Sequence, residues 1–514
     1  MGMGQMEERV SFERALELLT EGVSPCGTER IPALRAWGRV LAESVRAPMD
    51  QPPWPRAAMD GYAVRAAETA GASADRPVRF LVKDRICAGG TPSVKIGKGE
   101  AARIMTGAPV PPECDCVVRQ EDTVRGEAGE LQEDTVRGER TYAGKGARTG
   151  AEMNSGIGDV LVLKEMKSWE NYCFAGDDFR KGAVILPAGT RIDGNAVGIL
   201  ASAGLWKEGT ELTVYRKVRC ALICTGDELV PAAWPEGGAA ERGTAGCSTA
   251  DDGMNAGGTA ENGSRAADWG PAGGDVPQLP PGKIYSSNGP ALFCRLQDLG
   301  AEVTLYRETF PDSAEALADT FREAAGAGTC GSSGAGVRGL SGAGQEEAQK
   351  AAQKAVQKAD LIITVGGVSV GEKDILHETL ARPEAEILFR GVRLKPGAPM
   401  IYSRYCGVPV LSLSGNPFAA AATFELFARS FIERLSGDES LRPQKLRGVL
   451  KTPFGKSGKV PRFVRALFRD GEVFLPEGHS SGLLASAAGT NCLAVIPAGA
   501  GSLPAGSEVE VRLL

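Results

Sequence analysis

The stretch "KADLIITVGGVSVGEKD", residues 358–374, holds the pattern that decides the fold. Its apolar and β-branched run at 361–365 predicts a short buried strand. The strand runs directly into two consecutive glycines, and the acids Glu372 and Asp374 follow. Such an ending is either a tight turn and nothing more, or a ligand-binding edge at the carboxyl end of a parallel strand.

Strand and helix patterns alternate on both sides of this stretch. Within one of the helix patterns, Asn288 is the expected cap and Gly300 the expected end. This alternation is typical of crossover units, so residues 215–437 are predicted to form a doubly wound, mostly parallel α/β domain. We expect strands at 218–224, 301–306 and 360–365, and a helix within 284–300 that Asn288 caps and Gly300 ends. Further helices are expected near 312–325 and 374–381, and a strand, turn and long helix at 408–435.

The two ends of the chain have different patterns. Residues 6–20 have helical spacing, with Ser11 as the expected cap. Residues 441–514 contain short alternating runs and an Asp470-Gly471 turn signal, which predict a small β-domain or barrel.

Length and composition limit the classes of protein that need to be considered. At 514 residues the chain is too long for one ordinary core, so three or four domains are expected. A net charge of −6 argues against a general nucleic-acid binder. The twelve cysteines include no CxxC pair, and we find no secretory signal or long apolar run. We therefore expect a cytoplasmic protein with no membrane association.

Three segments are interpreted as insertions into a folded framework. Residues 120–140 contain the same eight residues twice, which suggests a slipped loop or a hairpin. Residues 231–282 are rich in Gly, Ala, Pro and Ser, and 325–357 begin Gly/Ser-rich and end as a solvated helical run. The last two are expected to be weakly ordered and dispensable for folding.

Polar and glycine-rich turns follow several of the predicted strands. They lie at 225–228 (TGDE), 287–288, 366–374 and 414–417 (SGNP), where an open α/β sheet binds its ligands. In the last turn, a capping Asn416 followed by proline leaves backbone N–H groups facing an anion. An ordinary capped helix is the alternative, and a glycine pair by itself fits a plain turn equally well.

Acidic and basic side chains near these turns suggest how an anionic ligand is held. Glu228, Glu372 and Asp374 could coordinate Mg²⁺, which takes one or two carboxylates together with ligand oxygens, although acids after strands are often solvated caps. In "RLKPGAPMIYSR" (393–404) two prolines stiffen a loop that carries Lys395, a point charge suited to an oxyanion. A surface turn is the alternative for that loop.

Two motifs outside the α/β domain also place polar groups on permissive backbone. Asp60 lies in "MDGY" and Thr106 in "TGAP", and each could equally serve only as a β-turn residue. The only histidines are His377 and His479, so Ser-His-Asp triads and histidine-rich metal sites are not expected.

Eight stretches together resemble the molybdopterin molybdenumtransferase family, which includes bacterial MoeA and the C-terminal domain of gephyrin. They occur in the family's order and cover nearly the whole chain except the insertions. In chain order they are "AAMDGYAV", "RIMTGAPVP…DCVVRQEDT", "ENYCFAGDDFRKGAVILPAGTRI", "CTGDELV", "IYSSNGPAL", "DLIITVGGVSVGEKD", "LKPGAPM" and "LSGNPFAAAATFELF".

The resemblance implies an enzyme of molybdenum cofactor biosynthesis that inserts molybdate into adenylylated molybdopterin with release of AMP, using Mg²⁺. A non-catalytic pterin-binding or scaffold homologue, and a molybdopterin adenylyltransferase, are the alternatives. As catalytic residues it implies Asp60, Thr106, Glu228, Asp374, Pro396 and Pro399, with Glu228 and Asp374 as the metal ligands. As pterin-nucleotide-binding residues it implies Asp178, Asp312, Gly366, Gly367, Ser369, Lys395, Ser414, Gly415 and Asn416.

The same resemblance implies a layout of domains and partners. It predicts a multidomain α/β plus β protein, in which a MogA-like α/β domain follows an elongated N-terminal pair of domains and precedes a small C-terminal β-barrel. The expected ranges are 1–48 with 168–212 (linker or dimerisation), 49–167 (β-rich), 213–438 (α/β, with its two insertions) and 439–514 (barrel). A homodimer with a shared active site is implied, with molybdopterin adenylyltransferase and molybdoenzyme apoproteins as possible partners.

The chain departs from the family at three positions. Ala398 replaces the usual second lysine of KPGKP, Ala419 replaces the serine after the GNP turn, and Ser414 replaces a common proline. Losing the lysine and the serine weakens the set of oxyanion donors. The affinity for molybdate is therefore in question more than the fold.

Overall fold

The structure, a computed structural model, consists of two compact units. It describes residues 6–126, 134–136, 139–141, 158–230, 279–310, 313–327, 358–368, 375–456, 458–478, 480 and 482–514. The first unit comprises Met1–Arg30, Gly38–Ala42 and Thr213–Leu514, and the second comprises Ile31–Trp37 and Glu43–Leu212. The strands β2 (Thr28–Pro32) and β15 (Glu211–Tyr215) carry the chain from one unit to the other.

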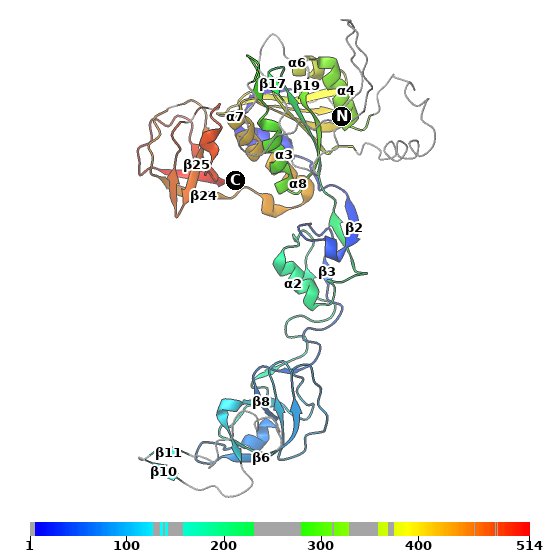
Figure 1. Ribbon diagram of the computed structural model, residues 1–514, viewed down its shortest axis with the longest axis vertical. Helices are drawn as coiled ribbons and strands as arrows, with labels where there is room; N and C mark the ends of the chain where they lie inside the picture. Colours follow the sequence, from blue (N-terminus) through cyan, green and yellow to red (C-terminus); the bar gives the residue numbers. More distant parts are fainter. Residues whose placement is uncertain are drawn as a thin grey trace, which may run out of the picture. The chain divides into compact units, whose positions relative to one another are not determined.

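The first unit is built on a mostly parallel sheet of seven strands (Figure 1). In spatial order the strands are β1 (Glu7–Val10), β21 (Ala385–Val392), β22 (Ile401–Tyr405), β23 (Val408–Leu413), β20 (Leu361–Val365), β16 (Arg219–Thr225) and β19 (Glu302–Phe310). Only β22 runs antiparallel to its neighbours β21 and β23, and the other pairs are parallel. The predicted doubly wound, mostly parallel α/β domain is confirmed.

Helices cover both faces of this sheet. One hydrophobic core packs the sheet against α1 (Phe12–Thr20), α3 (Asn288–Asp298), α7 (Pro417–Thr423) and α8 (Arg429–Ser436). A second core packs the opposite face against α4 (Ala314–Ala324) and α6 (Ile375–Leu380). A π-helical turn, Phe424–Ala428, joins α7 to α8. The short strands β17 (Leu229–Val230) and β18 (Ile284–Tyr285) pair beside the sheet.

The C-terminal part of the first unit is a closed five-stranded barrel, which confirms the β-domain predicted there. Its strands are β24 (Lys445–Leu450), β26 (Glu472–Phe474), β25 (Arg462–Arg469), β27 (Cys492–Ile496) and β28 (Glu508–Leu513). Asp470 and Gly471 have φ of 53° and 81° and form the turn between β25 and β26, as the Asp-Gly signal predicts. Phe463 and Leu493 of the barrel belong to the same core as α1, so barrel and sheet form one packed body.

The second unit contains a six-stranded sheet and smaller strand pairs. The sheet order is β8 (Cys116–Arg119), β5 (Gly61–Val64), β7 (Glu100–Ile104), β6 (Val78–Ile86), β12 (Gly158–Val162) and β9 (Thr123–Gly126). The pairs are β4 (Arg56–Ala57) with β13 (Tyr172–Cys173), and β3 (Val45–Arg46) with β14 (Val184–Leu186), and the helix α2 spans Gly194–Ser202. Within the duplicated segment, β10 (Asp134–Val136) and β11 (Glu139–Thr141) form a hairpin.

Two predictions about helix starts were wrong. Residues 7–10 form the edge strand β1 instead of the first helical turns, because they pair in parallel with β21, and the helix begins only after Ser11. Ser11 caps it as predicted, by accepting a hydrogen bond from the backbone N–H of Arg14 at 3.1 Å. Asn288 is not the cap of α3, since Ser287 occupies that position and Asn288 is the first helical residue.

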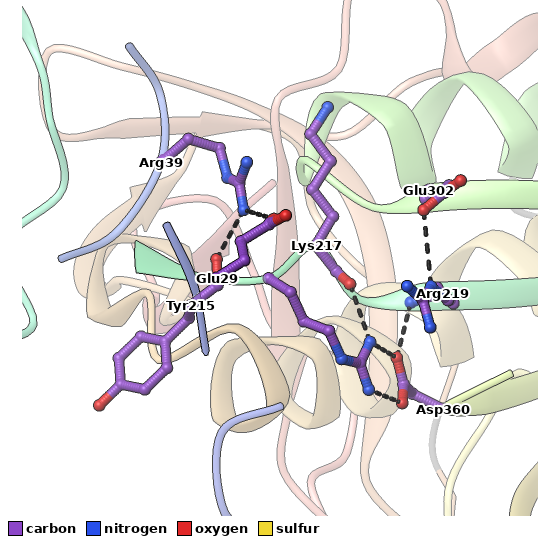
Figure 2. Close-up of polar contacts among 8 residues, drawn as sticks. Glu29, Arg39, Tyr215, Lys217, Arg219, Glu302 and Asp360 are labelled. Atoms are coloured by element: carbon purple, nitrogen blue, oxygen red, sulfur yellow. Dashed lines mark hydrogen bonds and ion pairs between the residues drawn. The ribbon is translucent and has the colours of Figure 1, made fainter. Parts of the chain in front are cut away.

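An ion-pair cluster anchors the chain where it enters the sheet of the first unit (Figure 2). Arg216 donates two hydrogen bonds to the Asp360 carboxylate at 2.6 and 2.5 Å. The backbone N–H of Arg219 donates to the same carboxylate at 2.9 Å. Arg39 donates to Glu29 at 2.5 Å and to the carbonyl of Tyr215 at 2.7 Å. The cluster thus holds the start of β16 against β20.

Candidate functional site

The carboxyl ends of the central strands meet closely at glycines. Gly366 follows β20 with φ of 100°, and a Cβ there would lie 2.5 Å from the carbonyl oxygen of Thr225, at the end of β16. Its N–H donates to the carbonyl of Leu413, at the end of β23, at 3.1 Å. Gly367 also has a positive φ, 64°. Only glycine fits this approach, so the pair is more than a plain turn.

The SGNP turn lies at the same edge. The side-chain amide of Asn288 donates to the carbonyl of Gly415 at 2.7 Å, so the start of α3 is tied to this turn. Asn416 occupies the cap position of α7 as predicted, but its side chain makes no capping hydrogen bond. Its N–H donates instead to the hydroxyl of the buried Ser414 at 3.4 Å. The structure thus brings together the glycine turn and the SGNP turn.

A cavity of about 310 Å³ opens beside the SGNP turn, between the α/β sheet and the barrel. Three cationic side chains line it, Lys395 from the proline loop and Lys456 and Arg462 from the barrel. The remaining lining residues are Pro396, Gly397, Ala398, Pro399, Ser414, Asn416, Phe418, Ala419, Phe454, Phe463 and Val464. Cationic donors over apolar walls suit a small oxyanion.

Backbone pairing builds this cavity. The N–H of Lys395 donates to Pro461 at 3.0 Å, and the N–H of Phe463 donates to the carbonyl of Lys395 at 2.8 Å, so the proline loop pairs with the start of β25. On its other side the loop lies against α7, where a Cβ on Gly397 would lie 2.2 Å from the Cγ2 of Thr423. The loop is therefore fixed in place and is more than a surface turn.

Arg465 lies in the barrel wall next to this cavity and is only 1% exposed. Its guanidinium stacks over the ring of Phe418, a lining residue, at 4.2 Å, and Nη2 donates to the carbonyl of Ser480 at 2.8 Å. Its Nε and Nη1 have no hydrogen-bond partner among the residues that the structure describes. Burial lowers the pKa of this guanidinium, and no anion among the described residues offsets the loss of water.

In the second unit, Asp60 and Thr106 contact each other directly. One carboxylate oxygen of Asp60 accepts from both the N–H and the hydroxyl of Thr106, each at 2.7 Å. These two hydrogen bonds lower the pKa of Asp60, so the exposed carboxylate is ionised at neutral pH. Asp178 is also exposed in this unit, and its N–H donates to Gln51 at 2.9 Å.

Of the other predicted site residues, the structure describes Glu228 but not Ser369, Asp374 or Asp312. Glu228 follows β16, and a Cβ built on Gly226 would lie 2.7 Å from its carboxylate. Ser369, Asp374 and Asp312 lie outside the described residues. Within the described ranges, no group of three or more His, Cys, Asp or Glu could hold a metal ion. A magnesium ion shared with a phosphate needs only one or two protein carboxylates, and Glu228 can supply one of them.

Sequence reasoning missed the cations of the barrel. Lys456, Arg462 and Arg465 lie about sixty residues or more after the proline loop, in a segment that we interpreted only as β-structure. The one available signal was Arg465 within the apolar run "FVRALF", a charge at an expected buried position. In the described parts of the chain, no helix is long and apolar enough to span a membrane.

Three family models match consecutive parts of the chain. The MoeA N-terminal region, domains I and II, matches residues 10–204. A probable molybdopterin-binding domain matches residues 338–434, and the MoeA C-terminal region, domain IV, matches residues 447–514.

Individual relatives match over nearly the whole length. A molybdopterin molybdenumtransferase of Staphylococcus aureus is 28% identical over 98% of this chain and 95% of its own. One from Staphylococcus epidermidis is 27% identical over 93% of this chain and 88% of its own. A solved molybdopterin biosynthesis MoeA protein of Pyrococcus horikoshii has a TM-score of 0.65 and 25% identity, covering 98% of this chain and 99% of the other. With this fold, these matched regions and these relatives, the chain belongs to the MoeA family of molybdenum cofactor biosynthesis.

Proposed function

We propose that this protein is a molybdopterin molybdenumtransferase, which inserts molybdate into adenylylated molybdopterin and releases AMP. The names of the staphylococcal relatives support this activity. The observation that carries the proposal is the cavity of about 310 Å³ whose lining includes Lys395, Lys456 and Arg462. A site for molybdate needs such a concentration of cationic donors in a protein whose net charge is −6.

In this proposal, the cavity compensates for the departures from the family pattern. Ala398 and Ala419 both line it, so the missing lysine and serine are missing from the cavity itself. Lys456 and Arg462 line the same cavity from the barrel side and supply cationic donors in their place. The buried Arg465, whose Nε and Nη1 have no hydrogen-bond partner among the described residues, adds positive charge behind the wall.

The pterin nucleotide binds at the adjacent strand ends in this proposal. The glycine turn and the SGNP turn let its phosphates approach the backbone closely at Gly367 and Gly415, with Ser369 and Asp312 as further contacts. Pro396 and Pro399 keep the Lys395 loop rigid. The protein acts as a homodimer, in which Asp60 of the partner subunit, with its bound Thr106, completes the site.

Magnesium completes the proposed chemistry. Glu228 and Asp374 would hold Mg²⁺, which when bound neutralises the phosphate charge beside the incoming oxyanion. Asp60 is ionised and can therefore accept a proton or a hydrogen bond from the substrate. The reaction belongs in the cytoplasm, where an adenylyltransferase supplies the adenylylated pterin and molybdoenzyme apoproteins receive the product.

The direct test is AMP release. Purified protein is mixed with adenylylated molybdopterin, Mg²⁺ and molybdate, and AMP is followed with and without molybdate. Molybdate-dependent release is expected, and Lys395→Ala should raise the molybdate KM roughly fivefold at low salt, since an exposed cationic donor is lost from the cavity. Lys445→Ala, an exposed lysine on β24, is the matched control and should behave as wild type.

Other outcomes separate the alternatives. Tight binding of the nucleotide without AMP release would favour a scaffold homologue and contradict the proposal. Formation of adenylylated molybdopterin from ATP and molybdopterin would instead show an adenylyltransferase. Equal molybdate KM values for Lys395→Ala and Lys445→Ala would show that the cavity is not the molybdate site.

A further inference from the structure

The second unit carries a cluster of three aromatic rings that the proposed reaction has not used. The Trp169 ring lies 5.0 Å from Tyr172 and 5.1 Å from Phe174, and Tyr172 lies 4.9 Å from Phe174. All three pairs are tilted or edge-on, at 72°, 48° and 60°, so no two rings stack face to face. Trp169 is 51% exposed and Phe174 is 43% exposed, which leaves aromatic surface available to a ligand.

The backbone that carries these rings is conformationally strained at Trp169. Trp169 has φ of 70°, in the left-handed region that a bulky side chain rarely adopts, and Asn171 has φ of 56°, which asparagine tolerates. Asn171 is held by its amide, which donates to Val117 at 2.8 Å, and by its carbonyl, which accepts from Ala58 at 3.0 Å. Tyr172 is half-buried against the core of the sheet. Strain of this kind, fixed by its surroundings, is typical of a functional segment.

One carboxylate contacts the backbone of the ring cluster. The N–H of Phe174 donates to the Asp177 carboxylate at 2.6 Å, and Asp177 and Asp178 are both exposed. The residue bonded to Asn171, Ala58, is only two positions before Asp60. The rings therefore lie on the segment that adjoins the Asp60–Thr106 pair, and the Asp177 carboxylate beside Phe174 is a hydrogen-bond acceptor.

The size of this patch fits a small ligand better than a protein. The exposed parts of Trp169 and Phe174 amount to roughly 200 Å², since a large aromatic side chain presents about 150–250 Å² in full. A stable protein interface needs about 800 Å² from each partner. A flat ring system with N–H donors at its edge matches both the aromatic surface and the flanking carboxylates.

We propose that Trp169, Tyr172 and Phe174 form a stacking surface for the fused aminopyrimidine ring of a pterin. The ring lies against Trp169 and Phe174, and its N–H donors pair with Asp177 or Asp178. This assignment rests on the proposed function, which requires a pterin substrate. It deepens that function by giving the ring of the substrate, as distinct from its phosphates, a place on the second unit.

The test measures binding of 6-hydroxymethylpterin alone, by its own fluorescence and by saturation-transfer NMR. Trp169→Gly removes the ring and also relieves the positive φ, so it should leave the melting temperature unchanged or raised. Its pterin affinity should fall roughly tenfold or more, because stacking is lost. Trp169→Phe should recover most of the affinity. Trp37→Ala, at a residue 71% exposed in the same unit, is the control and should bind as wild type.

Turnover gives a second readout. With adenylylated molybdopterin as substrate, Trp169→Gly should raise KM and leave kcat unchanged, since the ring binds the substrate and performs no chemistry. Equal pterin affinity of Trp169→Gly and wild type would overturn the assignment. So would dissociation of a wild-type oligomer by Trp169→Gly in sedimentation velocity, because the patch would then be a protein interface. Binding is measured without turnover, so a negative AMP assay would refute the proposed function and leave this result interpretable.

Discussion

Two arginines of the first unit differ in their partners: Arg216 has a carboxylate partner, and Arg465 has only a backbone carbonyl among the described residues. Arg216 forms a bidentate ion pair with Asp360, whose carboxylate is also bonded to the N–H of Arg219. Arg465 is almost fully buried, and only its Nη2 has a hydrogen-bond partner within the described parts of the chain. A paired charge stabilises the fold, whereas a buried charge without a counter-ion weakens it and is available to an anion. We therefore expect Arg216 to serve stability and Arg465 to serve binding.

Breaking the paired charge should have the largest effect. Asp360→Asn leaves Arg216 partly buried without a counter-charge, and the free energy of unfolding should fall by about 3–5 kcal/mol. Chemical denaturation of the first unit measures this change. Glu302→Gln is the control, since Glu302 contacts Arg219 only at 3.7 Å and its side chain is 62% exposed, so it should cost less than about 1 kcal/mol. Similar losses of unfolding free energy for both variants would show that the Arg216–Asp360 pair contributes no more than an exposed ion pair.

Removing the Arg465 charge should lower activity and spare stability. Arg465→Met should raise the molybdate KM roughly tenfold and lower AMP release at limiting molybdate, because positive charge is lost behind the cavity wall in a poorly screened position. Its stability should be unchanged or higher, since an uncompensated buried charge is removed. Arg469→Met, at an exposed arginine of the same strand, is the matched control. A large loss of stability with normal turnover would assign Arg465 to the fold.

Acid should remove the stability that the Arg216–Asp360 pair contributes. Burial raises the pKa of Asp360, but the hydrogen bonds from Arg216 and from the N–H of Arg219 outweigh it, so the net pKa is below its ordinary value near 3.8. The stability from this carboxylate is fully present above pH 4 and is lost as the pH falls through the lowered pKa. The difference in stability between wild type and Asp360→Asn should therefore shrink below about pH 4. A constant difference from pH 7 to pH 3 would contradict this assignment.

The fold and the glycine turn were predictable from the sequence because local signals carry them. Strand and helix periods predicted the α/β sheet, whereas the paired glycines predicted only a turn after β20, and the close approach of Gly366 to Thr225 follows from the packing of neighbouring strands. Residues 7–10 were misjudged because pairing with β21 outweighs their helical spacing. The barrel side of the cavity could not be predicted, since only the tertiary pairing of Lys395 with the start of β25 brings Arg462 there.

Substitution of the exposed Lys456 should have the smallest effect on the molybdate KM. Lys456 lines the cavity but is exposed to solvent, so its attraction for an anion is screened by salt. Lys456→Ala should raise the molybdate KM only about twofold to fivefold at low salt, with kcat unchanged, and the difference should nearly vanish at ~0.5 M salt. Arg465→Met should keep most of its defect at that salt concentration, because a buried charge is poorly screened. If both defects disappeared together with added salt, the distinction between exposed and buried cations at this cavity would be wrong.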